Sequence, residues 1–378
     1  MKTQNISIAT IFSGIGAPEQ ALRRLEINHK IIFACDNGDR LIDIDYNKEL
    51  LHIKKLKSKK EKNKYVNDLY DLKTRKTNFV KKSYLANYNL LDDNYYEDVK
   101  LLDGTPYKNK IDLFIGGSPC QSFSIVGARG GFEDTRGTLF YEYVRLIKEI
   151  KPKVFIYENV FGVLNHDKGK TWDTMQNTFS ELGYFYKWKI LDSRNYGIPQ
   201  GRRRLFVVGF DNEESYQKFY FPEEINLTYT MQDFLEENAA IGSIKSIDGK
   251  LTIINNKKGE PDEKYYLSPK LLKYCLSPGT KNFMHDDAKI DLPIARAILS
   301  TIGNSHRSSV NNYVTTNGRI RALTIREALR LMGFPDDYKI VVSKAQAYKQ
   351  AGNSIVVDVL IHIINKIIEA KEWNYGKN

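Results

Sequence analysis

The first 210 residues alternate short apolar stretches with stretches of helical spacing, and this alternation constrains the fold more than any other feature. We expect buried strands over residues 6–12, 31–35, 111–115, 154–157 and 205–210. Residues 138–150 have apolar side chains at helical spacing between two of these strands. Such an alternation is typical of a doubly wound, mostly parallel sheet with helices on both faces, so we predict an α/β fold.

The pattern changes at about residue 211, where the sequence becomes polar and rich in turns. Helical spacing returns at residues 324–333 and 354–370. We therefore predict a first domain over residues 1–210, a smaller, irregular domain over residues 211–335, and a C-terminal segment over residues 336–378. The helix at 354–370 is apolar almost all round, so we expect it to pack back on the first domain.

One segment carries most of the net charge of +11. Residues 51–82 contain twelve Lys or Arg and three Asp or Glu, which gives 12 − 3 = +9 and leaves +2 for the rest of the chain. Residues 52–64 have little apolar periodicity and are expected to form an exposed helix or a loop. Two interpretations stay open, a solvated insertion and a surface that contacts a polyanion outside the active site.

Composition and cysteine usage favour a soluble cytoplasmic protein without a membrane partner. The hydrophobic content is 42%, no apolar run approaches the roughly 20 residues of a membrane span, and the N-terminus lacks the features of a signal peptide. The three cysteines, Cys35, Cys120 and Cys275, are odd in number and include no C-x-x-C pair. This spacing argues against a disulfide framework and against a zinc site, so we expect no metal.

Cys120 lies where a predicted strand ends. Residues 111–115 are apolar and β-branched, and Gly116, Gly117 and Pro119 then impose a tight loop. Ligands bind at the carboxyl ends of the strands in open α/β sheets. The thiol of Cys120 is therefore a candidate nucleophile.

A glycine turn after the first strand and an acid after the second predict a nucleoside site. The sequence FSGIGA occupies residues 12–17, and Asp36 ends the second strand. Backbone amides of such a turn approach the ligand, and the acid accepts hydrogen bonds from ribose hydroxyls. The third glycine of a dinucleotide fingerprint is missing, which favours a nucleoside without pyrophosphate.

Two further motifs are expected at the same edge of the sheet. Glu158 and Asn159 follow the strand at 154–157, and a carboxyl kept protonated by burial beside a thiol suits attack on an electron-poor ring. Gln200, Arg202 and Arg204 precede the next strand, and the two arginines share one face because side chains alternate along a strand. Such arginines match a phosphate or a base carbonyl oxygen.

The ordered motifs resemble those of the DNA (cytosine-5)-methyltransferases of the bacterial or phage restriction-modification type. The resemblance covers nearly the whole chain, apart from the basic insertion at about 38–82 and the interior of the second domain. It rests on seven motifs in order: FSGIGA at 12–17, SPCQSFS at 118–124, RGTLF at 136–140, ENV at 158–160, QGRRR at 200–204, RALTIREALRLMGFP at 321–335 and QAGNSIVV at 350–357.

The resemblance implies a Rossmann-like methyltransferase that depends on S-adenosylmethionine. It would methylate carbon 5 of a flipped-out cytosine in a specific double-stranded DNA sequence, through a covalent adduct of Cys120 at carbon 6. By the same resemblance Glu158 would hydrogen-bond or protonate ring nitrogen 3, and Arg204 would contact the base carbonyl oxygen. Arg202 would support the nucleophile loop or the nearby backbone.

The resemblance also implies residues that bind the methyl donor. Asn37 stands where relatives often have a residue that stacks on the adenine, and Asp92 and Asp93 compete with Asp98 as the acid that reads the adenine edge. The implied cofactor residues are Phe12, Gly14, Ile15, Ala17, Asp36, Asn37, Asp98, Val99, Gly117, Pro119, Leu139, Asn353 and Ile355.

The implied partner is double-stranded DNA, with a cognate restriction endonuclease as a further candidate and a monomer as the expected state. Sequence preference would lie in a target-recognition region at about 211–318. His306, Arg307 and the adjoining Arg319 are expected at phosphates or the surface more than at bases. The residues implied in DNA binding are Gln121, Ser124, Arg136, Gln200 and Arg202.

Two alternatives stay open. A catalytically silent DNA-binding homologue would lack the chemistry, but intact Cys120, Glu158 and Arg204 count against it. A tRNA-cytosine methyltransferase would use the same chemistry on another substrate, and the recognition region and basic insertion favour DNA.

Overall fold

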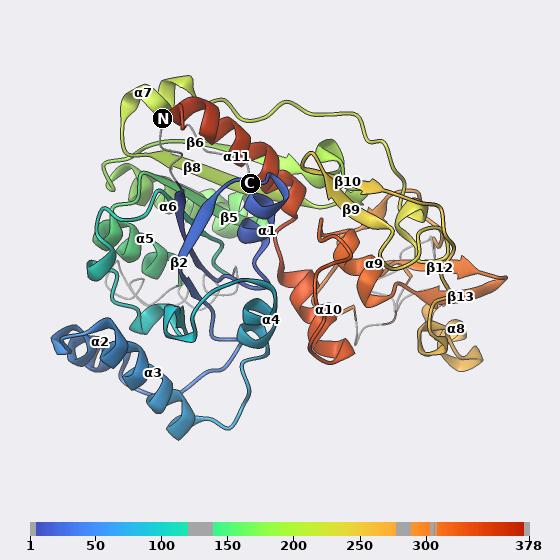
Figure 1. The fold of residues 1–378 in the computed structure, drawn as a ribbon, viewed down its shortest axis with the longest axis horizontal. Coiled ribbons are helices and arrows are strands. Elements are labelled where there is room, and N and C mark those ends of the chain that lie inside the picture. Colours follow the sequence, from blue (N-terminus) through green and yellow to red (C-terminus); the bar gives the residue numbers. More distant parts are fainter. Residues whose placement is uncertain (1–4, 120–138, 277–288, 303–305, 307, 374–378) are drawn as a thin grey trace.

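The computed structural model describes residues 5–119, 139–276, 289–302, 306 and 308–373. Its centre is a seven-stranded sheet with the order β3-β2-β1-β4-β5-β8-β6 (Figure 1). The five strands from β3 to β5 pair in parallel, and β8 and β6 are antiparallel to their neighbours. The strands are β1 (Ile6–Ile11), β2 (His29–Cys35), β3 (Tyr95–Tyr96), β4 (Leu113–Gly116), β5 (Val154–Val160), β6 (Phe185–Asp192) and β8 (Arg203–Phe210).

Side chains alternate between the two faces of this sheet and form two separate cores. On one face Leu113, Ile115 and Ile156 belong to a cluster with α1 (Ala17–Arg24), α4 (Phe79–Asn87) and α11 (Val357–Lys371). On the other face Phe114 and Phe155 belong to a cluster with α5 (Leu139–Ile150) and α6 (Lys170–Ser180). The predicted α/β fold with a mostly parallel sheet is therefore confirmed.

The chain changes direction across the sheet between β1 and β4. From β1 it proceeds outward to β2 and β3, and it then returns to place β4 on the other side of β1. In doubly wound sheets ligands bind in a crevice at the carboxyl edge beside such a change of direction, so we expect the ligand crevice next to the loops that follow β1 and β4.

The basic insertion forms a helical hairpin, α2 (Tyr46–Lys55) and α3 (Lys59–Lys73), at the edge of the molecule beside β3 and α4 (Figure 1). Asp45 caps α2, and Ser58 and Glu61 form a capping box at the start of α3. Only one side of the hairpin is apolar: Ile53, Val66 and Tyr70 pack with neighbouring Ile42 and Leu101. Most of its lysines lie exposed on the outer side.

The chain beyond β8 is built from short elements that flank this sheet (Figure 1). The division into domains stays a prediction. Helix α7 packs against β6, β8 and α11. The elements of this region are α7 (Glu213–Lys218), β9 (Ile244–Ile247), β10 (Lys250–Ile253), α8 (Pro269–Leu276), β11 (Ala295–Arg296), β12 (Tyr313–Thr316), β13 (Arg319–Ala322), α9 (Ile325–Arg330) and α10 (Lys344–Asn353), and β11 pairs with β7 (Gln200–Gly201).

The C-terminal helix α11 packs on the first domain, as its apolar surface predicts. It contacts α1 and α7, and its residues Leu360, Ile363 and Ile364 are buried. The stretch Lys344–Lys371 is long and apolar enough to cross a membrane, but 67% of its most apolar window is buried inside the protein. Residues 354–356 also interrupt the helix between α10 and α11, so this stretch has the character of a core segment.

Candidate active site

The loop after β1 exposes its backbone toward the crevice. Phe12, Gly14 and Gly16 all have positive φ angles, of 51°, 52° and 77°. This conformation strains Phe12, and such strain is concentrated at functional sites. A Cβ atom at Gly16 would collide with the ring of Tyr88, whereas one at Gly14 would meet, among the described residues, only the Phe12 carbonyl oxygen at 3.9 Å. The space above Gly14 is therefore open to a ligand. Ile15 and Ala17 complete the loop as buried side chains.

Asp36 follows β2 and faces this loop. Its carboxylate accepts hydrogen bonds from the Gly14 N–H at 3.0 Å and from the Gly38 N–H at 2.9 Å. Burial raises the pKa of Asp36 to about 6, although both backbone N–H groups lower it. Asn37 uses its amide in a local turn, accepting from the Asp39 N–H and donating to the Arg40 carbonyl. Its side chain is therefore engaged within the protein.

The structure separates Asp98 from its competitors. Asp92 and Asp93 precede β3 and are exposed, whereas Asp98 follows β3, so it lies at the same edge of the sheet as Asp36. Asp98 is buried and accepts hydrogen bonds from the Lys100 N–H at 2.9 Å and the Tyr70 hydroxyl at 2.6 Å. Val99 beside it is buried as well.

Glu158 lies on β5 opposite the end of β4. Its carboxylate pairs with Arg204, whose Nε lies 3.1 Å from Oε1. A Cβ atom at Gly117 would approach Glu158 Oε2 to 2.7 Å, so the absence of a side chain there makes room for the carboxylate. Burial raises the pKa of Glu158, and the nearby Arg204 and Arg202 offset part of this increase. Burial and the two guanidinium groups thus act in opposite directions on the Glu158 carboxyl, and burial is the larger effect.

A buried network holds the first residues of the nucleophile loop. The Ser118 hydroxyl lies 2.6 Å from the Tyr157 hydroxyl, and Asn159 Nδ2 donates to the Ser118 carbonyl at 3.3 Å and to the Tyr157 hydroxyl at 2.7 Å. Cys120, Gln121, Ser124, Arg136 and Arg307 lie outside the described residues. Sequence reasoning noted Asn159 beside the acid but missed its contact with the loop, because the pairing of β4 with β5 creates that contact.

Gln200 and Arg202 both contact backbone segments elsewhere in the protein. Gln200 is fully buried, with Nε2 donating to the Leu331 carbonyl and Oε1 accepting from the Ile298 N–H. Arg202 donates to the carbonyls of Ile298, Gly352 and Ser354, each at 2.9 Å. Both side chains thus hold backbone segments together, while Arg202 Nε has no hydrogen-bond partner among the described residues. Their contact with DNA stays a prediction.

The remaining expected residues lie around the same crevice or at the surface. Pro119 and Asn353 are exposed, and Leu139 and Ile355 are partly buried. In the second region Arg319 is exposed, pairs with Glu263 and stacks on Tyr266 at 4.2 Å, while His306 is partly buried. Within the described residues no group of three His, Cys, Asp or Glu side chains is placed to hold a metal ion.

The fold is that of a Rossmann-like methyltransferase, with a glycine loop after β1 and acids after β2 and β3 at the carboxyl edge of the sheet. The family described as "C-5 cytosine-specific DNA methylase" matches residues 6–369. The chain therefore belongs to this family, and it is an enzyme of the DNA (cytosine-5-)-methyltransferase type.

Two curated relatives and one solved structure illustrate the similarity. The Type II methyltransferase M.HhaI of Haemophilus parahaemolyticus is 36% identical over 258 residues, which are 68% of this chain and 75% of the relative. M.HpaII of Haemophilus parainfluenzae is 36% identical over 311 residues, covering 77% of this chain and 80% of the relative. The crystal structure of a Spodoptera frugiperda DNMT2 mutant superposes with a TM-score of 0.65 over 96% of this chain and 100% of that chain. At 14% identity it shows a shared fold alone.

Proposed function

We propose that the enzyme methylates carbon 5 of a flipped-out cytosine in a specific double-stranded DNA sequence, through a Cys120 adduct at carbon 6. The observation that carries this proposal is the Glu158–Arg204 pair beside Gly117, at the end of the strand that leads to Cys120. A carboxyl whose pKa is raised by burial, held against a guanidinium, matches the Watson–Crick edge of a cytosine ring.

Activation of the ring is required because carbon 5 of cytosine is a poor nucleophile. The Cys120 thiolate would form a bond to carbon 6, and the electrons displaced from the C5–C6 double bond would leave carbon 5 nucleophilic as part of an enamine. Nitrogen 3 of cytosine carries no proton, so its partner must donate one, and protonated Glu158 supplies it where negative charge develops. Arg204 would orient Glu158 and contact the base carbonyl oxygen. After methyl transfer, loss of the carbon 5 proton to solvent, return of the nitrogen 3 proton to Glu158 and departure of the Cys120 thiolate would restore the aromatic ring.

The methyl donor of this family is S-adenosylmethionine, which supplies an electrophilic methyl group when bound. The residues beside β1 and β2 fit its nucleoside: the space above Gly14 is open, and Asp36 presents a carboxylate to ribose hydroxyls. Asp98 lies at the same edge to accept from the adenine amino group. Phe12, Val99, Gly117, Pro119, Leu139, Asn353 and Ile355 would complete the pocket.

Double-stranded DNA is the proposed substrate, with residues of about 211–318 as the target-recognition region and Gln121, Ser124 and Arg136 as further contacts. The reacting carbon is inaccessible inside a duplex, so the nucleotide must leave the stack at a cost of a few kcal/mol. The Type II names of the relatives make a cognate restriction endonuclease a candidate partner, without need of direct contact. We expect a monomer in the cytoplasm of a bacterial cell.

A methylation assay tests this function. The protein is incubated with tritiated S-adenosylmethionine and mixed plasmid DNA, with transfer RNA as a parallel substrate, and the DNA is then sequenced after bisulfite treatment. We expect tritium in DNA and protected cytosines in one sequence context. Label in RNA alone would replace DNA by tRNA as the substrate, and no 5-methylcytosine in either nucleic acid would overturn the proposal.

The nucleophile is tested separately with Cys120→Ala. This variant should lose methyl transfer by at least about 10⁴-fold, since no other group can form the adduct, and still bind the methylated plasmid sequence. A variant that retains transfer would refute the role of Cys120. A variant with an altered melting temperature would be set aside in favour of Cys120→Ser.

A further inference from the structure

We propose that the α2–α3 insertion forms a wall of the adenosine pocket, with Tyr70 as a positioning residue for Asp98. This inference rests on the proposed function, because that function assigns Asp98 to the adenine. The family resemblance treats residues 38–82 as an insertion, so nothing in the shared motifs gives Tyr70 a role.

The contact between Tyr70 and Asp98 is direct and buried. Tyr70 lies on the inner side of α3 with none of its surface exposed, and its hydroxyl donates to Asp98 Oδ2 at 2.6 Å. The guanidinium of Arg40 lies over the Tyr70 ring, 4.7 Å from its centroid. The ring is thus fixed on both sides, by the guanidinium and by the small apolar core of the hairpin.

The two ends of the insertion contact each other beside Asp36, the other carboxylate that the proposed function assigns to the cofactor. Asn78, which caps α4, donates through Nδ2 to the Asp36 carbonyl and to Glu97 Oε2, each at 2.8 Å. Arg40 at the other end forms a buried ion pair with Glu97. Gly38 leaves room for Asn78, because a Cβ atom there would collide with the Asn78 side chain. The insertion therefore leaves and rejoins the fold around Asp36, Glu97 and Asp98.

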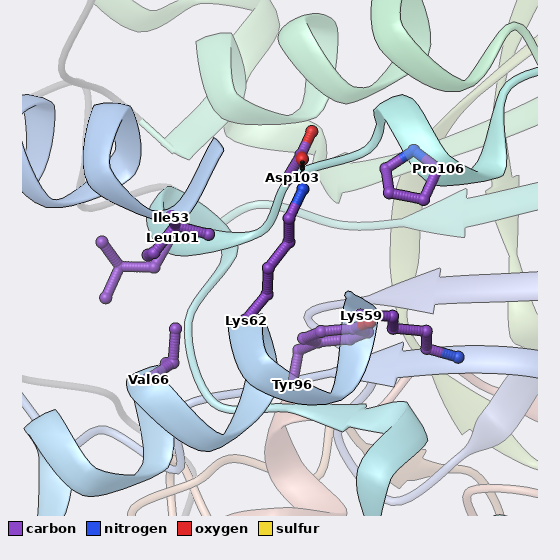
Figure 2. A pocket seen from close by; sticks show the side chains of 8 residues that line it. All are labelled: Ile53, Lys59, Lys62, Val66, Tyr96, Leu101, Asp103 and Pro106. Atoms are coloured by element: carbon purple, nitrogen blue, oxygen red, sulfur yellow. Dashed lines mark hydrogen bonds and ion pairs between the residues drawn. The ribbon is translucent and has the colours of Figure 1, made fainter. Parts of the chain in front are cut away.

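Helix α3 also contacts the chain before β3 and again beyond Asp98. Lys62 on α3 forms an ion pair with Asp103 at 2.5 Å, and Asn63 donates to the Asp93 carbonyl at 2.7 Å. Figure 2 shows a small pocket between the hairpin and this segment, with Lys62 extending from α3 toward Asp103. Contacts on either side of β3 thus fix the distance between α3 and the acid.

These contacts influence both the orientation and the protonation of the Asp98 carboxylate. Oδ1 accepts from the Lys100 N–H and Oδ2 from the Tyr70 hydroxyl, so the carboxylate plane is set while further lone pairs remain for an amino group. Burial raises the pKa of Asp98, and the hydrogen bond from Tyr70 lowers it. Without the hydroxyl the carboxylate would be less well oriented and more readily protonated, and both effects weaken acceptance from the adenine.

Tyr70→Phe tests the inference in the full-length protein, with S-adenosylhomocysteine as the probe in calorimetric titration. We expect its Kd to rise about fivefold to tenfold, which is within the range for loss of a typical hydrogen bond. The KM for S-adenosylmethionine should rise in parallel, while kcat at saturating donor and the Kd for DNA stay within about twofold.

Tyr65→Phe is a matched control on the same helix. The Tyr65 hydroxyl also donates to a carboxylate at 2.6 Å, but its partner is Glu49 within the hairpin. We expect this variant to bind S-adenosylhomocysteine as the wild type does. An equal loss in the two variants would mean that the hairpin acts only through its stability, and it would overturn the inference.

Asp98→Asn separates failure of the inference from failure of the proposed function. If Asp98→Asn binds S-adenosylhomocysteine normally, the adenine role of Asp98 is wrong and the inference falls with it. If Asp98→Asn weakens binding but Tyr70→Phe does not, only the inference is wrong. In the double variant, Tyr70→Phe should add no more than about twofold to the loss from Asp98→Asn, whereas additive losses would show that Tyr70 acts elsewhere.

Discussion

Burial changes the pKa of Asp36 and therefore the pH range in which its carboxylate can bind a ligand. Its carboxylate receives two backbone N–H groups, yet burial outweighs them and its pKa rises from 3.8 to about 6. The carboxylate form is the better acceptor for ribose hydroxyls. Above pH 6 most molecules therefore hold Asp36 ready for the nucleoside, and below pH 6 a proton occupies the same site.

This titration predicts a pH dependence of cofactor binding. The Kd for S-adenosylhomocysteine should be flat above about pH 7 and should rise as the pH falls through about 6, by about tenfold between pH 7.5 and pH 5. Calorimetric titration across this range measures it. Asp36→Asn is the control, because an amide does not titrate: its binding should be weak at every pH, with a much smaller change below pH 6. An unchanged pH profile in this variant would assign the titration to another group.

At the scale of elements, the strands and helices of the first domain could be predicted because their apolar periodicity is strong. The expected strand at 154–157 extends to Val160 as β5, and the expected helix at 354–370 is α11, Val357–Lys371. Two strands of the seven-stranded sheet were not predicted. β3 has two residues, and β6 is an edge strand whose Phe185 and Trp188 are about 40% exposed, so neither carries the pattern of a buried strand.

The hairpin of α2 and α3 shows why part of the site lay beyond prediction. Lysines dominate its sequence, and its one apolar side depends on a few residues such as Ile53, Val66 and Tyr70. The partner of Tyr70 is Asp98, 28 residues further along the chain. A hydrogen bond between helix α3 and the segment after β3 follows from tertiary packing, and neither residue signals it by local spacing.

The close contact between Gly117, which follows β4, and Glu158 on β5 gives a prediction at the scale of elements. In Gly117→Ala the new Cβ would lie 2.7 Å from Glu158 Oε2 and 3.0 Å from the Glu158 carbonyl, so the carboxyl must move. We expect kcat for methyl transfer to fall about 10²-fold, because displacement by about 1 Å misaligns the proton donor. Because Gly117 is also an expected cofactor residue, kcat is measured at saturating S-adenosylmethionine, so that weaker cofactor binding does not contribute to the loss. The opposite result, intact turnover with weak cofactor binding, would place Glu158 outside the chemistry.

At the scale of the whole molecule, one arginine joins four distant segments. Arg24 at the end of α1 makes two hydrogen bonds to Asp358 on α11, at 2.6 and 2.8 Å, and donates to the carbonyls of Gly333 and Gly249. Its side chain is 1% exposed and that of Asp358 is 9% exposed. The first and last helices and two turns of the second region are thus fixed to one guanidinium.

Removal of this arginine should destabilise the protein. Arg24→Ala leaves the Asp358 carboxylate buried without its partner, so the free energy of unfolding should fall by about 3–5 kcal/mol. Arg23→Ala is the neighbouring control, because its pair with Asp337 is solvent-exposed, and it should cost no more than about 1 kcal/mol. Urea unfolding followed by tryptophan fluorescence compares the two, and equal losses would contradict this account of Arg24.

The two ends of the α2–α3 insertion contact each other, and this contact affects how the chain tolerates added residues. Gly38 and Asn78 touch where the insertion begins and ends, so the distance between Asp36 and Asp98 is independent of how many residues lie between them. Closing a longer loop costs little free energy, because the cost grows only with the logarithm of its length. New sequence could therefore accumulate at the exposed turn between α2 and α3, residues 56–58, while the spacing of the two carboxylates stayed unchanged. That turn is accordingly the natural position for a fluorescent label or an affinity tag.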